Sequence, residues 1–253
     1  MKNVLSTLGL KMRGAIYVGT SGWTYYAWKD AFYAGVPRNA WLAYYARHFR
    51  AVEVNATFYH QLKQSTFAKW TGTTPPDFRF AIKGHRYLTH VLKLKVPRDV
   101  FLRQMRVVKS LGKKLAVVLW QLPGKLERDT ERLERFACML DTWHGTRHAL
   151  EFRQRSWFDE RTAACLRRHH LAVCQSDAAD WPMWDAVTTD LVYVRLHGHG
   201  ATYQSSYTRR ERSSWAVRAR CWSSEGRSVH IYFDNTDAGH ATRDAQRLAA
   251  LLA

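Results

Sequence analysis

The sequence predicts a single (β/α)8 barrel, an α/β TIM-barrel fold in which some helices are irregular or shortened. Eight short apolar runs recur along the chain, each followed by a helix-compatible stretch. The length of 253 residues is close to the roughly 250 residues typical of one such barrel. Polar residues crowd the C-terminal ends of most runs, where barrels of this class carry their functional groups. The runs are 16–19, 52–58, 78–83, 115–122, 148–153, 171–177, 191–198 and 229–235.

The first half of the chain begins this rhythm with a glycine-containing turn after the first run. Segment 39–49 then places apolar residues at helical spacing. In segment 52–59 polar residues alternate with apolar ones, and successive side chains of a strand point to opposite faces. We therefore expect the polar set to face the barrel interior. This set is Glu53, Asn55, Thr57 and Tyr59.

The remaining runs continue the pattern to the C-terminus. The run 115–122 is continuously apolar, as expected for a parallel strand covered on both faces. Segment 126–140 has the apolar face of an amphipathic helix. We also expect helices over 101–111, 162–169 and 241–252, and loops at the strand ends over 179–184 and 198–207.

Composition bounds the domain count and the partners. No linker rich in proline, glycine or serine divides the chain, so we expect one domain over 16–253 after an N-terminal extension over 1–15. The net charge of +18 and the pI near 10.1 favour polyanionic partners. A pI above about 9 is typical of nucleic-acid-binding domains. The alternative is an arginine-rich surface that mainly aids solubility.

Other sequence features point to the cytoplasm and to a protein without a bound cofactor. The four cysteines are scattered and form no C-x-x-C pair, so we expect free thiols and no metal site. Residues 1–13 show no sustained apolar segment and no small-residue cleavage site, so we do not expect secretion, and no apolar run is long enough to span a membrane. Phosphate-binding loops, dinucleotide-binding glycine motifs and nucleophile elbows are missing.

Charged residues at the strand ends form the strongest candidate site, because a barrel brings these ends to one mouth. Arginine supplies forked donors suited to phosphate or carboxylate, and carboxylates and imidazoles can transfer protons. The predicted catalytic residues are Glu53, Glu151, His197 and Asp177. The predicted ligand-binding residues are Asn55, Thr57, Lys83, His90, Gln121, Arg153, Arg195, Trp23, Tyr59, Trp157 and Asn235.

Each of these signals has an alternative interpretation. The carboxylates could pair with arginine and lysine inside the barrel as a satisfied ionic core. They could instead gather around a metal with His197, although neighbouring basic residues would oppose a cation. Aromatic residues in the strand-end loops suit stacked bases or sugars, but they could simply anchor the loops. These aromatic residues include Trp23, Tyr25, Tyr26, Trp28, Tyr59, Trp157, Trp181, Trp184 and Tyr203.

Several short motifs recur in order from about residue 16 to the C-terminus. They are VGTSGW at 18–23, VEVNATFY at 52–59, TH at 89–90, QLP at 121–123, EFR at 151–153 with SW at 156–157, YVRLHG at 193–198, and YFDN at 232–235 with GHA at 239–241. Together they resemble the YecE-like family, a domain of unknown function (number 72). The resemblance implies a TIM barrel with a cleft at the strand ends, and proposals for the family lean toward DNA binding. The chain departs from the family at Asp234, where the family usually has asparagine, and at Pro123, where it often has two prolines.

We therefore expect a basic mouth at the strand ends that binds nucleic acid or another phosphate-bearing ligand. If the ligand is cleaved, the activity would be that of a phosphodiester hydrolase, so whether the chain is an enzyme stays open. The alternative is a carbohydrate-type hydrolase or isomerase that uses the paired carboxylates Glu53 and Glu151. A third reading is a non-catalytic interaction module. Salt separates the first two, because polyanion binding weakens steeply with salt and binding of a neutral sugar does not.

Overall fold

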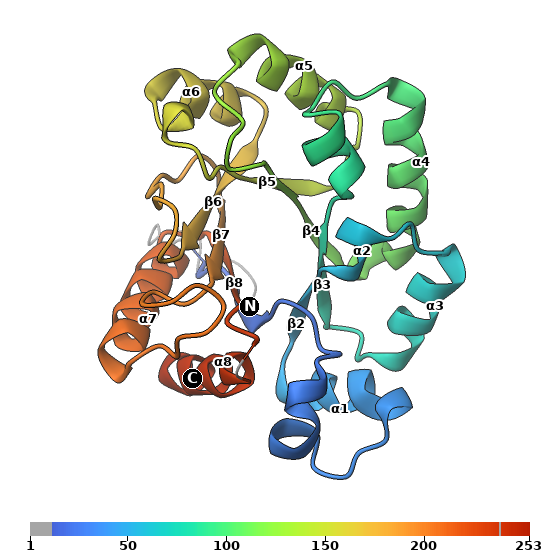
Figure 1. Cartoon of the computed structure of the whole chain (residues 1–253), viewed down its shortest axis with the longest axis vertical. Helices are drawn as coiled ribbons and strands as arrows, with labels where there is room; N and C mark the ends of the chain where they lie inside the picture. Colours follow the sequence, from blue (N-terminus) through green and yellow to red (C-terminus); the bar gives the residue numbers. More distant parts are fainter. Residues whose placement is uncertain (1–11, 238) are drawn as a thin grey trace, which may run out of the picture.

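The computed structural model describes residues 12–237 and 239–253, and it shows eight parallel strands arranged around a barrel (Figure 1). The strands follow the order β1-β8-β7-β6-β5-β4-β3-β2, with parallel pairing throughout. The predicted (β/α)8 barrel is therefore confirmed. The strands are β1 (Ile16–Thr20), β2 (Ala51–Val54), β3 (Arg79–Lys83), β4 (Leu115–Gln121), β5 (Arg147–Glu151), β6 (Leu171–Asp177), β7 (Leu191–Leu196) and β8 (Ser228–Phe233).

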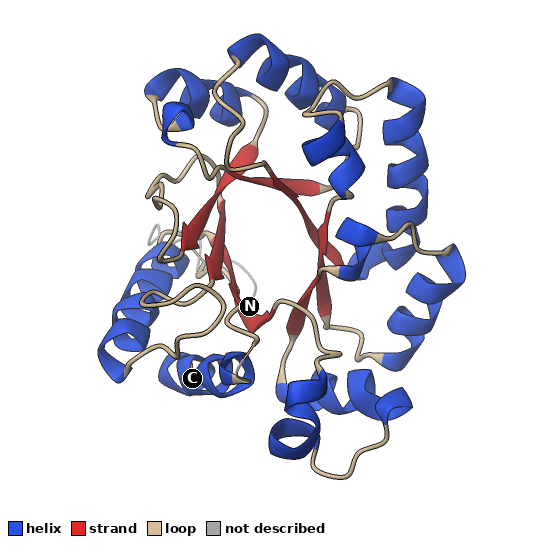
Figure 2. Cartoon of the chain, in the orientation of Figure 1, coloured by secondary structure: helices blue, strands red, loops and turns tan. Residues whose placement is uncertain are grey.

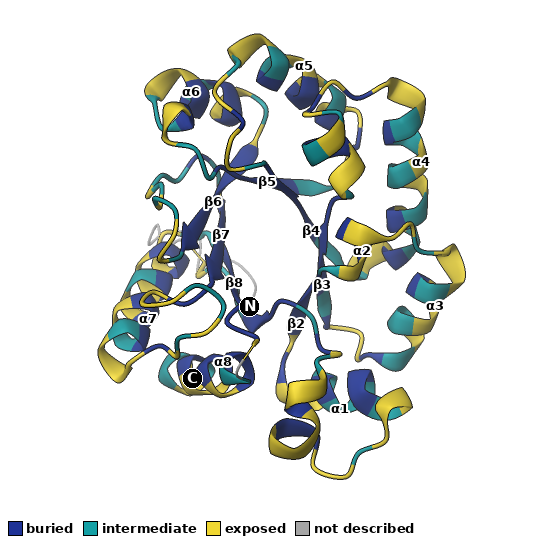
Figure 3. Cartoon of the chain, viewed as in Figure 1, coloured by how far each residue is buried: buried dark blue, intermediate teal, exposed yellow. Residues whose placement is uncertain are grey.

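The helices lie outside the ring of strands (Figure 2). In the described part of the chain, none of them is both long and apolar enough to cross a membrane. Figure 3 shows that the strands are buried almost throughout, whereas the helices expose their outer sides. The helices are α1 (Trp41–His48), α2 (Ala56–Tyr59), α3 (Gln64–Thr73), α4 (Arg98–Val108), α5 (Thr130–Asp141), α6 (Glu160–Arg168), α7 (Arg209–Ser224) and α8 (His240–Leu252).

The expectation of a helix after every strand is wrong for the sixth unit. Residues 178–190, between β6 and β7, are all described and contain no helix. This segment covers β6 in an extended form instead: the Thr188 hydroxyl donates to the Leu171 carbonyl at 2.6 Å and accepts from the Val173 N–H at 3.1 Å. Trp184 stacks on Phe158 with ring centroids 5.2 Å apart. Side chains of the segment thus replace the missing helix.

The barrel interior alternates small and large residues. Alanines on four strands point inward, together with two tyrosines from β7 and β8. Small side chains on one side of a narrow barrel leave room for large ones from the other side. This allows long side chains from β7 to reach across the interior toward β2 and β5. The inward alanines are Ala51, Ala81, Ala149 and Ala172, and the tyrosines are Tyr193 and Tyr232.

The barrel has a seam between β1 and β2. Strand β1 pairs with β8 along its whole length. It meets β2 at a single parallel bridge between Ser21 and Glu53, where the Gly22 N–H donates to the Glu53 carbonyl at 2.7 Å. Glu53 therefore closes the barrel with its backbone at the same place where its side chain enters the interior.

The predicted alternation over 52–59 holds only as far as Val54. Asn55 already has helical backbone angles (φ −84°, ψ −22°), and residues 56–59 form α2. Once the period changes from two to 3.6 residues, strand parity no longer decides which way a side chain points. Glu53 faces the interior as expected, whereas Tyr59 is exposed and Thr57 anchors the turn.

Candidate functional site

Arg195 occupies the centre of the mouth and is fully buried. Its Nε donates to Glu53 Oε2 at 3.0 Å, its Nη1 to Glu151 Oε2 at 2.8 Å and its Nη2 to Asp234 Oδ2 at 2.8 Å. The remaining N–H groups face Glu53 Oε1 at 2.8 Å and His197 Nε2 at 3.1 Å. All five guanidinium donors are therefore engaged by the protein itself. We call Arg195, Glu53, Glu151, Asp234 and His197 the Arg195 cluster.

Glu53 connects the seam between β1 and β2 to the Arg195 cluster. Besides Arg195, its carboxylate accepts hydrogen bonds from the Ser21 hydroxyl and, at 2.6 Å, from the Tyr193 hydroxyl. Both oxygens are fully buried and have several donors each, which a buried carboxylate requires. Glu53, on β2, is therefore held in place by Ser21, just after β1, and by Tyr193 and Arg195 of β7.

Glu151 links the cluster to the rim of the mouth. Its Oε1 accepts from Arg153 Nε at 2.6 Å. Burial alone would raise the pKa of Glu151, but Arg153 and Arg195 hold that pKa well below its ordinary value. The guanidinium of Arg153 also lies over the Trp181 ring, 3.7 Å from the centroid, and keeps part of its surface exposed. Trp181 in turn donates to the Ser176 hydroxyl at 2.9 Å.

His197 is held neutral beneath this rim. Burial, followed by the charge of Arg195, lowers its pKa. Its Nε2 faces a guanidinium donor of Arg195, while its Nδ1 lies 3.0 Å from Asp234 Oδ2. This arrangement suits the tautomer with its proton on Nδ1. Burial would raise the pKa of Asp234, but Arg195 and His197 lower it to about 2.

Lys83, at the end of β3, is a cation of the mouth without a direct ion-pair partner among the described residues. It is only 7% exposed, and within the described residues it makes no ion pair closer than 4.0 Å. Its Nζ lies 4.2 Å from the centre of the Phe58 ring. Burial, followed by Arg195, lowers the pKa of Lys83 to about 8. Nearby, burial and Lys83 lower the pKa of His90 to about 4, so His90 is neutral at pH 7.

A pocket of about 840 Å³ opens beside the mouth, at the C-terminal ends of β1 and β2. Trp23 and Trp70 form one wall and meet edge to face with ring centroids 5.1 Å apart. Asn55 also lines the pocket, and its Oδ1 is buried without a hydrogen-bond partner among the described residues. The charged residues of the lining are both basic, Arg38 and Lys69.

Three of the predicted site residues, Trp23, Asn55 and Tyr59, therefore line this pocket rather than the centre of the mouth. Five others are connected by hydrogen bonds, which confirms the prediction that they meet. Glu53, Glu151, Arg195 and His197 belong to the Arg195 cluster, and Arg153 is bonded to its Glu151. Lys83 and His90 lie close enough to that cluster for its charges to influence their pKa values: Arg195 and Glu151 act on Lys83, and Arg153 and Glu151 act on His90.

The structure does not bring Asp177 into the cluster. On β6 the side chains of Ala172 and Cys174 belong to the barrel interior and that of Ser176 reaches Glu151 at 3.4 Å, so Asp177 falls on the alternate face. Its Oδ1 pairs with His199 Nδ1 at 2.9 Å.

Four other predicted ligand-binding residues make hydrogen bonds within the protein. The Thr57 hydroxyl donates to the Lys83 carbonyl at 2.7 Å, and Gln121 Nε2 donates to the Leu122 carbonyl at 2.8 Å. Trp157 Nε1 donates to the Leu126 carbonyl at 2.7 Å. Asn235 Nδ2 donates to Asp244 Oδ2 at 2.9 Å. These bonds fix the strand-end loops around the mouth.

Sequence reasoning left Asp234, Ser21 and Tyr193 out of the predicted site. The parity of β8 carries the signal for Asp234, since Tyr232 points into the barrel and Asp234 is two residues further on. The same rule applied to Arg195 identifies Tyr193 as its inward neighbour. Ser21 carries the same signal, because Tyr17 of β1 packs against the barrel interior and Ser21 is four residues further on.

Arg195 also fills the position that a metal ion would need, since its guanidinium contacts all three carboxylates of the mouth. Within residues 12–237 and 239–253, the side chains spaced closely enough to hold an ion lie elsewhere, at Glu134, Cys165 and His169. The mouth is thus organised by an internal cation.

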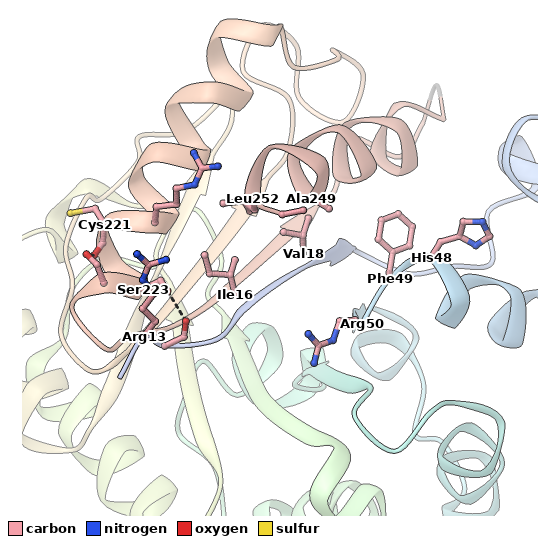
Figure 4. Close-up of a pocket in the computed structure, with 14 residues that line it drawn as sticks. Arg13, Ile16, Val18, His48, Phe49, Arg50, Cys221, Ser223, Ala249 and Leu252 are labelled. Atoms are coloured by element: carbon pink, nitrogen blue, oxygen red, sulfur yellow. Dashed lines mark hydrogen bonds between the residues drawn. The ribbon is translucent and has the colours of Figure 1, made fainter. Parts of the chain in front are cut away.

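Another pocket, of about 770 Å³, lies at the opposite end of the strands (Figure 4). It is bounded by Ile16 and Val18 of β1, by residues before β2 and by the C-terminal parts of α7 and α8. Arg13 and Arg50 lie at its edge, and the Ser223 hydroxyl donates to the Gly14 carbonyl at 2.6 Å. In barrels of this class the N-terminal face usually serves stability rather than chemistry.

Comparison with known proteins agrees with the fold. The chain is 25% identical to the UPF0759 protein YunF of Bacillus subtilis over 271 aligned positions, covering 94% of each chain. It is 30% identical to the UPF0759 protein YecE of Escherichia coli over 109 positions, which cover 43% of this chain and 38% of YecE. The crystal structure of a DUF72 family protein from Thermotoga maritima superimposes with a TM-score of 0.82 at 28% identity, covering 94% of this chain and 99% of that one. The family described as "Protein of unknown function DUF72" matches residues 17–253, and the chain belongs to that family.

Proposed function

We propose that the mouth of this barrel binds a phosphate-bearing ligand, and that the ligand is a strand of nucleic acid. The observation that carries the proposal is Lys83, a largely buried lysine at a strand end with no direct ion-pair partner among the described residues. A buried charge is costly unless it is paired. A phosphate oxygen that enters the mouth would provide the missing partner.

Arg153 supports the same proposal from the other side of the mouth. Its Nε donates to Glu151, its guanidinium also interacts with the Tyr203 hydroxyl, and its plane rests on Trp181. A stacked guanidinium presents its remaining N–H groups along its edge, where they suit phosphate oxygens. Arg195, in contrast, has every donor engaged, so we assign it the role of positioning Glu53, Glu151 and Asp234.

The neighbouring pocket favours a nucleotide over a free phosphate. Its walls carry Trp23, Tyr25, Tyr59 and Trp70, and its charged residues are basic. Aromatic faces beside basic groups suit stacked bases with phosphates between them. The net charge of +18 would also draw a polyanion toward the surface.

The alternative of a carbohydrate-type hydrolase with paired carboxylates has less support. Such an enzyme needs one carboxyl group whose pKa is raised so that it can donate a proton. Arg153 and Arg195 instead hold the pKa of Glu151 well below its ordinary value despite its burial. If the bound strand is cleaved as well, Lys83, with a pKa of about 8, is the group of the mouth best suited to donate a proton near neutral pH.

Fluorescence anisotropy with a labelled single-stranded oligonucleotide, at low and high salt and at pH 7, tests the proposal. We expect the unaltered chain to bind at low salt and to weaken as salt rises. Lys83→Met should weaken binding and make the plot of log affinity against log salt shallower by about one.

Lys113→Met is the matched control, because it removes the same charge from an exposed position just before β4, at the opposite end of the barrel. It should change affinity little. Absence of binding at low salt would overturn the proposal. Equal effects of Lys83→Met and Lys113→Met would replace it with binding to the basic surface in general.

A further inference from the structure

Helices α5 and α6 pack side by side on the outside of the barrel (Figure 1), and three different metal-ligating side chains meet between them. Glu134 comes from α5, Cys165 from α6, and His169 directly follows α6. One ligand atom of each lies within 4.8 Å of the others. We propose that Glu134, Cys165 and His169 form a binding site for a zinc-like divalent cation, separate from the mouth of the barrel.

The spacing of these residues places them on facing sides of the two helices. Cys165 and His169 are four positions apart, so they share one face. On α5 the corresponding face carries Glu134, Cys138 and Asp141, at spacings of four and three. Two helical faces that each present ligands one turn apart can surround a single ion.

The orientation of His169 is the second observation that points to a metal. Its Nδ1 lies 2.6 Å from Asp141 Oδ2, while its Nε2 lies 2.8 Å from Glu134 Oε1. Histidine ligands of metals usually donate their other ring N–H to a carboxylate, which fixes the ring and makes the free nitrogen more basic. Asp141 is placed to play that part, with Nε2 directed toward the other two ligands.

The chemistry of the donors decides which ions suit the site. A thiolate, an imidazole and a carboxylate together favour zinc, cobalt or a similar transition metal over magnesium or calcium, which prefer oxygen ligands. Three protein ligands also leave a fourth tetrahedral position for water or another group. Cys165 is buried and Glu134 is half-buried, so the site is sheltered but reachable from solvent.

Three features must change when a metal binds: the hydrogen bond between His169 Nε2 and Glu134 Oε1, the ion pair of Glu134 with Arg168, and the proton of the Cys165 thiol. Glu134 Oε2 pairs with Arg168 at 2.5 Å, but that guanidinium is largely exposed, and exposed pairs contribute little stability. The Cys165 thiol must lose its proton, as thiols do when a metal binds, so binding releases protons. Without a metal, His169 simply bridges two carboxylates as an ion pair, and this is the outcome that the experiment must distinguish.

Cobalt titration of the untagged, chelator-treated full chain tests the proposal, because a bound thiolate gives cobalt a strong near-ultraviolet charge-transfer band. We expect the band to saturate at one equivalent and to disappear when zinc is added. Cys165→Ser and His169→Gln should remove it, and Asp141→Asn should weaken zinc binding by about 10- to 100-fold.

Cys221→Ser and His144→Gln are the matched controls, since both residues are exposed and lie outside the three-residue group. They should leave the titration unchanged. No band with the unaltered chain, or a band that survives Cys165→Ser, would overturn the proposal.

A measurement on the unaltered protein keeps the test independent of whether the variants fold. X-ray absorption at the zinc edge of the loaded chain should show one sulfur and otherwise nitrogen or oxygen neighbours. A shell without sulfur would place the ion elsewhere on the chain and contradict the assignment of Cys165.

Discussion

The Arg195 cluster in the mouth and the Glu134, Cys165 and His169 group between α5 and α6 both bring carboxylates and a histidine together, but they balance charge in different ways. In the mouth the cation is a side chain, fully buried and bonded to three carboxylates. Between the helices the carboxylates meet a histidine and a thiol, both of which can exchange a proton for a metal. The Arg195 cluster is closed, because its own arginine already neutralises the carboxylates, whereas the group between the helices is open to an added cation.

The largest expected effect comes from removing the internal cation. Arg195→Ala would remove the cation shared by three buried carboxylates, and it should lower the free energy of unfolding by about 3–5 kcal/mol. Glu134→Gln, in the other group, should cost less than about 1 kcal/mol, because its ion pair is partly exposed. Urea unfolding at pH 7 compares the two variants. Similar losses for both would contradict the contrast between a closed and an open group.

Replacing Lys83 should change the free energy of unfolding by a smaller amount and in the opposite direction. Its pKa falls from 10.5 in the unfolded chain to about 8 in the folded one, so the unfolded chain binds more protons between these values and stability rises with pH across that window. At pH 7 the charged ammonium therefore destabilises the fold. Lys83→Met should raise the free energy of unfolding at pH 7 by roughly 1–3 kcal/mol. Urea unfolding that shows a loss instead would mean that Lys83 has a stabilising partner.

The smallest expected effect concerns how the contributions of His197 and His169 to stability depend on pH. Burial and Arg195 lower the pKa of His197, so its contribution to stability is lost as pH falls below 6.5. Burial would lower the pKa of His169 too, but Glu134 and Asp141 raise it, so its contribution is present below 6.5 and lost as pH rises through the raised pKa.

The variants His197→Gln and His169→Gln, unfolded with urea from pH 5 to 8 in the presence of chelator, should therefore change the pH profile in opposite directions. Comparison with the unaltered chain is needed because His148 and His230, buried with pKa values of about 3, also favour loss of stability in acid. Changes of the same sign in the two variants would show that the two histidines do not differ in this way.

The barrel and much of its mouth could be predicted because both depend on short-range alternation. Parity places Glu53, Glu151 and Arg195 inside the barrel, and the structure joins them. The same rule fails at Asn55, where the backbone turns helical, and Asp177 was misplaced because Ser176 holds the inward position at the end of β6. Neither the turn nor the exact parity is visible from residue types alone.

The group Glu134, Cys165 and His169 did not stand out in the sequence for a different reason. The prediction about cysteines rests on ligands that are neighbours in the sequence, as in C-x-x-C motifs. Glu134 comes from one helix, whereas Cys165 and His169 belong to the next, so only the packing of α5 against α6 brings them together. The sequence alone shows only that Cys165 and His169 are four positions apart and so share one face of a helix.

The seam between β1 and β2 has a consequence for how the chain folds. Strand β1 is made first among the strands, yet its long ladder is with β8, near the C-terminus, and in the described residues its pairing with β2 is a single bridge. While the chain is still being synthesised, β1 has almost nothing to pair with, and its open edges invite pairing with other chains. Contacts between such distant residues also form slowly, because a long loop must close first. We therefore expect the barrel to close late in folding, when β8 pairs with β1.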